Sequence, residues 1–329
     1  MAKHLYFIGN GFDLHHNINS SYSNFRDWLD ETNPEILNRV DEIYGYCDSK
    51  WWSDFENQLA SLDALRFGGE IAFENPPDLL SDHCDRTWND AEIEVEQQLE
   101  ALYSDIRLCF HDWIIQLNPP AIEKKVKIET VDSIFINFNY TKTLESLYGI
   151  SSSKILHIHG CVDLDEDFIL GHGKTYEELE RINQENIPEP PDNFSDEELA
   201  EFYEERANSG QEFHEQLAIN AAVSGVASQR KPVAELIKKY SPIFESIKDV
   251  KYIHVYGLSL SVVDLPYLEY FVSRYMSAHW EFNDYNNENK EKIERFCQAY
   301  RLQTYSIIEL ENIQYTRQLC IEFPKDRGM

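Results

Sequence analysis

The chain has 329 residues, enough to bury a substantial core in one elaborated domain or two compact ones. Its formal net charge of -30 at pH 7 repels phosphate backbones, so broad, sequence-independent binding of DNA or RNA is not expected. The N-terminus leads straight into a short strand instead of a signal peptide, and no segment approaches the roughly 20 apolar residues of a membrane span. We therefore expect a cytoplasmic protein with no membrane association.

Six cysteines are scattered along the chain without a close pair. This spacing is typical neither of a structural zinc site nor of a disulfide scaffold. We expect free, mostly buried thiols and no bound metal. The cysteines are Cys47, Cys84, Cys109, Cys161, Cys297 and Cys320.

The first expected element is a strand over residues 3–8, because this short apolar run is ended by a glycine and asparagine turn. A helix is expected after Ser20 or Ser21, either of which can cap it, since aromatic residues follow at helical spacing. Residues 34–125 then form an expected all-helical insertion. Its main element is a long helix over residues 88–117 with one apolar stripe, ended by Pro119 and Pro120.

Strands and helices alternate in the remainder of the chain, apart from the strongly acidic segment 163–216. That segment contains Pro188, Pro190 and Pro191, and we interpret it as an exposed helical insertion or lid. The alternation predicts one α/β domain over residues 1–329 with a mostly parallel sheet. Strands are expected at 131–137, 154–158, 250–256, 278–282 and 304–310, and helices at 141–148, 265–276 and 288–300.

Polar clusters follow four of the predicted strands, at Gly9–Asp13, Asn137–Thr141, His157–Gly160 and Gly257–Asp264. Ligands of open parallel sheets bind outside the carboxyl ends of the strands, where segments distant in sequence converge. The four clusters therefore predict one ligand-binding crevice.

The glycine turn permits close approach of a phosphate to main-chain N–H groups near a helix start. Leu14 stands where the dinucleotide fingerprint GxGxxG has its third glycine, which disfavours an ordinary Rossmann dehydrogenase. Asp13 either binds a ribose hydroxyl or a reacting water, or caps the following helix. The ligand-binding residues predicted in this turn are Gly9, Asn10, Gly11 and Phe12.

In the second cluster, Asn139 is suited to orient a ribose or a water, and Thr141 either caps the next helix or contacts the ligand. In the third, strand alternation predicts that His157 and His159 point to the same face. A histidine at a strand end can act as a general base near neutral pH. We assign that role to His159 and a structural role to His157.

Taken together and in this order, the segments IGNGFDL, SYSNF, WWSDFENQL, NFNYTKTLE, HIHG and GLSLSVVD resemble the AbiH family of bacteriophage abortive-infection proteins. AbiH proteins are in turn similar to the sirtuin-type NAD-binding fold. The resemblance implies a sirtuin-like modified Rossmann fold with a mostly parallel central sheet and large helical insertions. It also implies a role in antiphage defence, triggered by a phage component or a partner defence protein.

Several segments resemble sirtuin motifs: Gly9–Gly11 the glycine-rich loop, Asn139 the asparagine of the TQN-type motif, His159-Gly160 the catalytic pair, and Gly257–Leu260 the ribose-phosphate loop. The cysteine quartet that binds zinc in sirtuins is absent, so neither that metal site nor protein deacylation is expected. The ligand-binding residues that the resemblance implies further are Tyr140, Thr141, Gly257, Ser259, Leu260 and Asp264.

The implied reaction is hydrolysis of the nicotinamide–ribose bond of NAD, with a transition state that resembles an oxocarbenium ion. Asn139 would hold the ribose and a water, His159 would act as general base, and Asp13 would orient the ribose or stabilise the cation. Glu56, in the motif WWSDFENQL, either brings a carboxylate over the crevice or is a solvated acid on a helix.

Two alternatives stay open. The first is a metal-dependent phosphoesterase or nuclease. The second is a defence sensor that binds a nucleotide without turnover. The composition is also compatible with a homo-oligomer whose interface includes the aromatic segment 51–62. The ligands available to the metal-dependent alternative are Asp13, His15, His16, Asn139, His157, His159 and His172.

Overall fold

A six-stranded, fully parallel sheet forms the centre of the fold in the computed structural model, which describes residues 2–77, 87–162, 168–185, 195, 211–285 and 289–313. The strand order is β3-β2-β1-β4-β5-β6, which is the order of Rossmann-type sheets. The predicted α/β fold with a parallel sheet is confirmed. The strands are β1 (His4–Ile8), β2 (Ser133–Asn137), β3 (Ile155–His157), β4 (Tyr252–Tyr256), β5 (His279–Asn283) and β6 (Tyr305–Ile308).

The register of the sheet brings the ends of its strands level. Ile8 at the end of β1 lies beside Asn137 of β2 and beside Tyr256 of β4. Asn137 in turn lies beside His157, the last residue of β3. The polar clusters that follow these strands therefore start from one edge, on both sides of the point where the strand order reverses direction.

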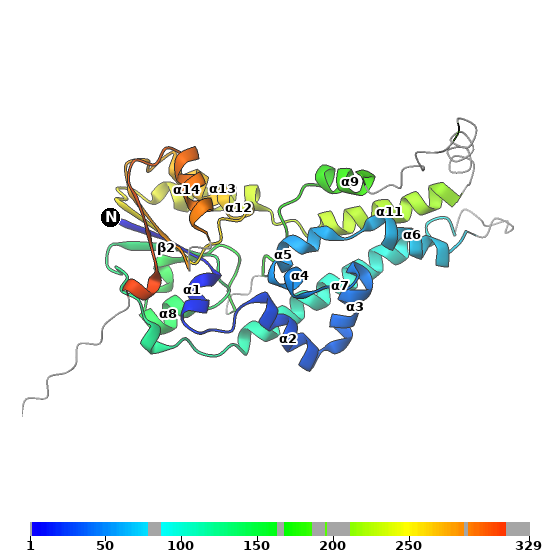
Figure 1. The fold of residues 1–329 in the computed structure, drawn as a ribbon, viewed down its shortest axis with the longest axis horizontal. Coiled ribbons are helices and arrows are strands. Elements are labelled where there is room, and N and C mark those ends of the chain that lie inside the picture. Colours follow the sequence, from blue (N-terminus) through cyan, green and yellow to red (C-terminus); the bar gives the residue numbers. More distant parts are fainter. Residues whose placement is uncertain are drawn as a thin grey trace, which may run out of the picture.

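Helices cover both faces of the sheet (Figure 1). Helices α12 (Val233–Ser246), α13 (Leu265–Val272) and α14 (Lys290–Ala299) lie on one face, and α1 (Asn10–His15) and α8 (Thr143–Tyr148) on the other. Alternate side chains of β1 enter the two hydrophobic cores, with Leu5 and Phe7 in the first and Tyr6 and Ile8 in the second.

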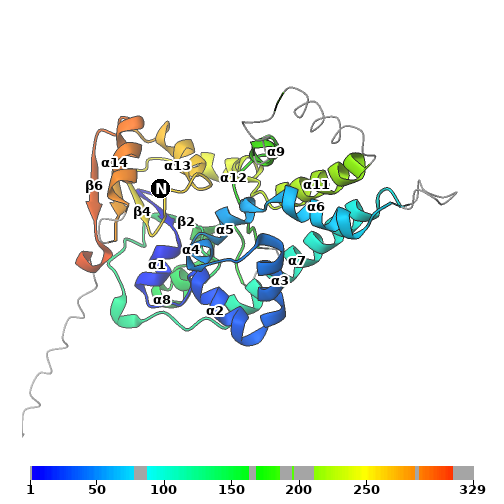
Figure 2. The same cartoon turned by 45° about the vertical axis from the view of Figure 1, so that its right-hand side comes forward.

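A helical body lies beside the sheet and extends away from it (Figures 1 and 2). Its helices α6, α7 and α11 run side by side, and Gly68 lets α6 approach the main chain of α11 closely, because a Cβ there would lie 2.7 Å from the Ile219 nitrogen. The body comprises α2 (Tyr22–Thr32), α3 (Pro34–Tyr44), α4 (Ser49–Ser53), α5 (Phe55–Gln58), α6 (Ala64–Glu74), α7 (Asp90–Ile115), α9 (Tyr176–Glu185) and α11 (Gln211–Ala227).

The helical body has a hydrophobic core of its own, rich in aromatic rings. The Phe25 ring is fully buried among those of Trp52, Phe55, Phe110 and Trp113. Trp52 and Phe55 belong to the segment proposed as an oligomer interface, but their side chains are part of this core. Short 3-10 turns connect the elements at Leu59–Ser61, Ile122–Lys124, Ser152–Lys154 and Leu310–Ile313.

The predicted strands and helices agree with the structure to within a few residues. Ser21 is the residue that caps α2, because its side chain accepts a hydrogen bond from the Asn24 N–H. The long helix α7 ends at Ile115, before the predicted proline stop. Of the acidic segment, α9 and the start of α11 are described, whereas Pro188, Pro190 and Pro191 lie outside the described residues. The proposed division into insertions stays a prediction.

Four cysteines are described, and all four are free and buried, as predicted: Cys47, Cys109, Cys161 and Cys297. Cys84 and Cys320 lie outside the described residues. Across the described ranges, no helix has the length and apolar character needed to cross a membrane.

Replacing Phe25 with alanine should lower the free energy of unfolding by about 3–5 kcal/mol, because the change leaves a cavity among packed rings. Urea unfolding followed by circular dichroism measures this loss. The matched aromatic control is Tyr46→Ala, at a side chain that is 89% exposed, where the change should stay within about 0.5 kcal/mol. Equal losses in the two variants would contradict the assignment of Phe25 to the core.

Candidate functional site

A cleft of about 580 Å³ opens between the carboxyl edge of the sheet and the helical body. The loops after β1, β2, β3, β4 and β5 all contribute to it, and Tyr22, Glu56 and Phe110 reach it from the helical body. The four predicted clusters thus share one crevice, as expected from the sheet topology. The predicted site residues that line it are Gly9, Asn10, Gly11, Asp13, Glu56, Asn139, Tyr140, Thr141, His159, Gly257, Ser259 and Asp264.

Two predicted ligand-binding residues, Phe12 and Leu260, do not line the cleft. Their side chains are buried in the two hydrophobic cores on opposite faces of the sheet. Apolar side chains next to a loop turn inward to the core.

The glycines of the first and fourth clusters meet each other across the sheet edge. Gly9 N–H donates to the Tyr256 carbonyl and Gly11 N–H to the Gly257 carbonyl, both at 2.9 Å. A Cβ on Gly257, whose φ is 68°, would lie only 2.1 Å from the Phe12 nitrogen. Close packing of two backbones therefore accounts for this glycine pattern. It also means that two N–H groups expected to face a phosphate are already bonded within the protein.

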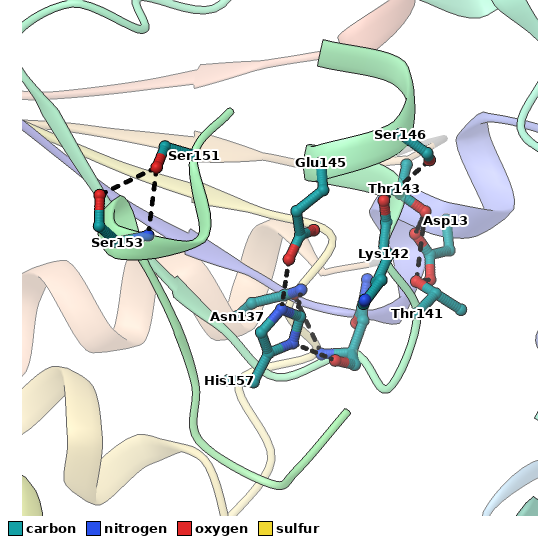
Figure 3. A network of polar contacts seen from close by, with 11 residues as sticks. Asp13, Asn137, Thr141, Lys142, Thr143, Glu145, Ser146, Ser151, Ser153 and His157 are labelled. Atoms are coloured by element: carbon teal, nitrogen blue, oxygen red, sulfur yellow. Dashed lines mark hydrogen bonds and ion pairs between the residues drawn. The ribbon is translucent and has the colours of Figure 1, made fainter. Parts of the chain in front are cut away.

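Asp13 ties the first loop to the second (Figure 3). It is 1% exposed, and its carboxylate accepts hydrogen bonds from the hydroxyls of Thr141 and Thr143. The Asn139 amide donates to the Gly9 carbonyl at 3.1 Å. Burial raises the pKa of Asp13 to about 6, although these hydrogen bonds oppose the rise.

Neither Asp13 nor Thr141 caps a helix. Asp13 lies within α1, whose N-cap is Gly9, and the N-cap of α8 is Lys142. The capping interpretations of both residues were wrong, because the two side chains bond to each other instead. Asn10 is likewise engaged locally, since its amide donates to the Ser20 carbonyl and its carbonyl oxygen accepts from the Ser20 hydroxyl.

The two histidines of the third cluster point to opposite faces, so the prediction of a shared face was wrong. Strand β3 ends at His157, and strand alternation does not extend to His159. His157 pairs with Glu145 of α8 at 2.9 Å (Figure 3). Burial lowers the pKa of His157, but hydrogen bonds with Cys161 and Glu145 outweigh burial and raise it to about 9. His157 is therefore a structural partner of α8.

His159 lies in the cleft wall, 2% exposed, with its ring against Phe138 and Tyr267. Burial lowers the pKa of His159 well below its usual value, and the nearby Lys231 ammonium adds to this effect. One ring nitrogen bonds to the Phe138 backbone, while Nε2 has no hydrogen-bond partner within the described residues. A neutral imidazole whose other nitrogen bonds to a carbonyl presents Nε2 as an acceptor.

A charged group closes one end of the cleft. The Lys231 ammonium lies 2.7 Å from Oε1 of Glu56, and Lys231 is 4% exposed. Tyr140 donates its hydroxyl to the Ile169 carbonyl at 2.9 Å and lies 3.4 Å from the same Glu56 oxygen. Burial raises the pKa of Asp264 to about 6, and Lys231 opposes that rise. Two acids, one lysine and a neutral histidine therefore share this end.

Some lining residues were missed by sequence reasoning. Lys231 stands in a polar run before α12, and nothing in that pattern marks it. Asn283 is different, because it ends β5 at the same sheet edge, so the rule that identified the other clusters would have found it. Its carbonyl oxygen accepts from the Gly257 N–H at 3.2 Å. Other missed lining residues are Tyr22, Phe110, Lys124, Tyr285, Asn289 and Glu311.

The histidines considered as metal ligands are bonded in separate places. His16 pairs with the Phe12 carbonyl and the Tyr148 hydroxyl, and His172 with the Val226 carbonyl. Within the described ranges, no group of three or more His, Cys, Asp or Glu side chains is placed to hold a metal ion. The metal-dependent alternative has no ligand cluster in that part of the chain.

A family model described as "Bacteriophage abortive infection AbiH" matches residues 5–284. The chain belongs to the AbiH family. The AbiH match runs from β1 to β5 and includes the described helices of the helical body. Among the residues that line the cleft, Tyr285, Asn289, Leu310 and Glu311 lie beyond the match. No curated protein and no solved structure matches the chain. The resemblance to sirtuins accordingly stays a prediction, whereas membership of an antiphage family is established.

Replacing Gly257 with alanine should destabilise the protein far more than the same change at Gly149. Both glycines have positive φ, 68° and 65°, so both variants lose about 1–2 kcal/mol from backbone strain. Only Gly257 also faces backbone atoms, whereas nothing lies within 4 Å of a Cβ on Gly149. We expect an additional loss of at least about 2 kcal/mol for Gly257→Ala in urea unfolding. Equal losses would contradict the loop contact.

Replacing Asp13 with asparagine should change how stability depends on pH. A carboxyl group whose pKa rises on folding, here from 3.8 to about 6, makes the folded protein bind the proton more tightly. The wild type should therefore lose stability relative to Asp13→Asn as pH rises through that interval, by about 1.4 kcal/mol per unit of raised pKa. The exposed Asp27→Asn variant is the control and should track the wild type. Parallel curves for Asp13→Asn and wild type would contradict the burial effect.

Proposed function

We propose that this AbiH protein acts in antiphage defence by hydrolysing the nicotinamide–ribose bond of NAD. The observation that carries the proposal is one end of the cleft, where Glu56, Asp264 and His159 lie around Lys231. Nε2 of His159 has no hydrogen-bond partner among the described residues. In an infected cell, loss of NAD would stop the metabolism on which phage replication depends.

The shape and position of the cleft support a dinucleotide ligand. Its volume of about 580 Å³ falls in the range of roughly 300–1,000 Å³ typical of ligand pockets. It lies at the reversal of strand order between β1 and β4, where nucleotides bind in sheets of this topology.

The loop after β4 offers a donor for the pyrophosphate. Ser259 lines the cleft, and among the described residues its main-chain N–H group donates to no acceptor. Leu260 has a φ of 52°, a left-handed conformation that is strained for a leucine and is often found where a backbone is shaped for a ligand. Successive N–H groups in such a loop form a concave site for anions.

The charge of the closed end suits the bond to be broken. The nicotinamide ring of NAD is cationic while attached, and its departure leaves positive charge on the ribose. Carboxylates at this position stabilise that charge, as general electrostatic catalysis requires. The ring leaves as a neutral base, so no acid is needed to protonate it. Purine nucleosides, whose leaving groups need protonation, should be poor substrates.

In this proposal, water attacks the ribose carbon while the electron pair of the breaking bond moves to the pyridine ring. His159 Nε2 accepts a hydrogen bond from the water, and Asn139 holds the ribose. Asp264, with a pKa of about 6, is ionised near neutral pH and can take the proton that the water releases. Asp13, whose carboxylate already bonds two threonines, shapes the loops and does not react.

The test is incubation of purified protein with NAD, followed by chromatography for nicotinamide and ADP-ribose. Wild-type protein should release both in equal amounts. Asp264→Asn should lower the rate at least about 100-fold, because general base catalysis contributes roughly that much. His159→Ala should also lower the rate, because it removes the group that orients the attacking water. Glu269→Gln, a change on the exposed surface of α13, is the control and should keep the wild-type rate.

Each variant is compared with the wild type by thermal unfolding, so that a loss of activity is not mistaken for a loss of fold. Wild-type rates in Asp264→Asn and His159→Ala would contradict the assigned roles. Binding of NAD without any release of nicotinamide, in the presence of lysate from phage-infected cells, would instead favour the non-catalytic sensor.

A further inference from the structure

Lys231 is a buried cation in an acidic cleft, and no sequence motif marked it. We propose that Lys231 is the positioning residue of this site: its ammonium group fixes the Glu56 carboxylate over the end of the cleft and supplies the positive charge that lets two acidic side chains share it. Its part in catalysis rests on the proposed function, but its effect on the neighbouring groups does not.

The contacts of Lys231 join the two halves of the molecule. Its ammonium lies 2.7 Å from Oε1 and 2.9 Å from Oε2 of Glu56, so it holds both oxygens of one carboxylate. Glu56 belongs to α5 of the helical body, whereas Lys231 lies just before Pro232, the N-cap of α12, which packs on the sheet. One ion pair therefore sets where the helical body places its acid relative to the sheet edge.

The main chain holds Lys231 in place. His172 N–H donates to the Gln229 carbonyl at 3.1 Å, and Lys231 N–H donates to the His172 carbonyl at 2.8 Å. Gly171 makes this approach feasible, because a Cβ there would lie 1.9 Å from the Gln229 oxygen. With its backbone bridged on one side and Pro232 at the start of α12 on the other, Lys231 has little freedom to swing away from the cleft.

The positive charge of Lys231 shifts the pKa values of Asp264 and His159. Like charges in a poorly solvated site disfavour ionisation of each other, and Glu56 raises the pKa of Asp264 in this way. Lys231 lowers the pKa of Asp264 and also that of His159. It thereby favours an ionised Asp264 and a neutral His159, the protonation states that the proposed reaction requires. The titratable or charged groups facing this site are Tyr22, Glu56, Tyr140, His159, Lys231, Asp264 and Tyr267.

The decisive experiment follows Asp264 directly. Protein labelled with ¹³C at the aspartate carboxyl carbons is titrated by NMR, and Asp264→Asn assigns the signal. In Lys231→Met the midpoint of the Asp264 titration should rise by about 1 pH unit or more, because an opposite charge is lost. Lys231→Arg keeps the charge and should restore a midpoint close to that of the wild type.

Lys231→Met leaves the Glu56 carboxylate without its ion-pair partner, and this unpaired charge could unfold the variant. A second comparison therefore uses variants that lack the Glu56 charge. Glu56→Gln and the double variant Glu56→Gln/Lys231→Met lack that charge and differ only at Lys231. The double variant should show the higher Asp264 midpoint. An unchanged midpoint in both comparisons would overturn the proposal.

If the wild type releases nicotinamide, the pH profile of kcat/KM gives a further readout. The acid limb of the Lys231→Met profile should move to higher pH, with activity recovering toward that of the wild type at alkaline pH. A uniform loss at every pH would show that Lys231 is only structural. Absence of nicotinamide release from the wild type counts against the proposed function alone, because the Asp264 titration still decides the role of Lys231.

Discussion

The contact between two backbones at Gly9–Gly11 and Gly257 is the constraint on which the rest of the site depends. It brings the loop after β1 against the loop after β4 with no side chain between them, and main-chain hydrogen bonds fix their spacing. Once these loops are joined, the parallel register of the sheet determines which residues follow at the same edge. The cleft is thus a consequence of backbone packing before any functional side chain is considered.

The helical body supplies the part of the cleft wall that the sheet does not provide. A Rossmann-type sheet supplies loops, but the acid that closes this cleft comes from α5, and aromatic side chains of α2 and α7 form part of its wall. The aromatic core around Phe25 holds these helices together, and the Glu56–Lys231 pair fixes them to the sheet. The AbiH match includes both the helical body and strands β1 to β5 of the sheet.

Much of the fold could be predicted because its signals are local. Short apolar runs predicted the strands, and the sheet-edge rule brought together eleven of the fourteen predicted site residues, while Glu56 reaches the cleft from α5. Side-chain direction was harder to predict. His157 and His159 were expected on one face, but β3 ends between them, and the position of a strand end depends on pairing with β2. The side chains of Phe12 and Leu260 are buried in hydrophobic cores, whose positions could not be predicted from the sequence.

Lys231 shows most clearly which kind of site residue could not be predicted from the sequence. Its partner Glu56 lies 175 positions away, and the bridge to His172 that fixes it involves no motif. Tertiary packing alone gives such a residue its role. The glycine turn matches a phosphate-binding loop in its sequence pattern, but the N–H groups of Gly9 and Gly11 donate to carbonyls of Tyr256 and Gly257.

The most direct test of the central claim, that this cleft destroys NAD during infection, is the NAD content of phage-infected cells. Cells carrying the wild-type protein are compared with cells carrying Asp264→Asn, with protein levels matched. NAD should fall before lysis in wild-type cells and stay constant in cells with the variant, which should no longer protect. Full protection by the wild-type protein with no fall in NAD would contradict it.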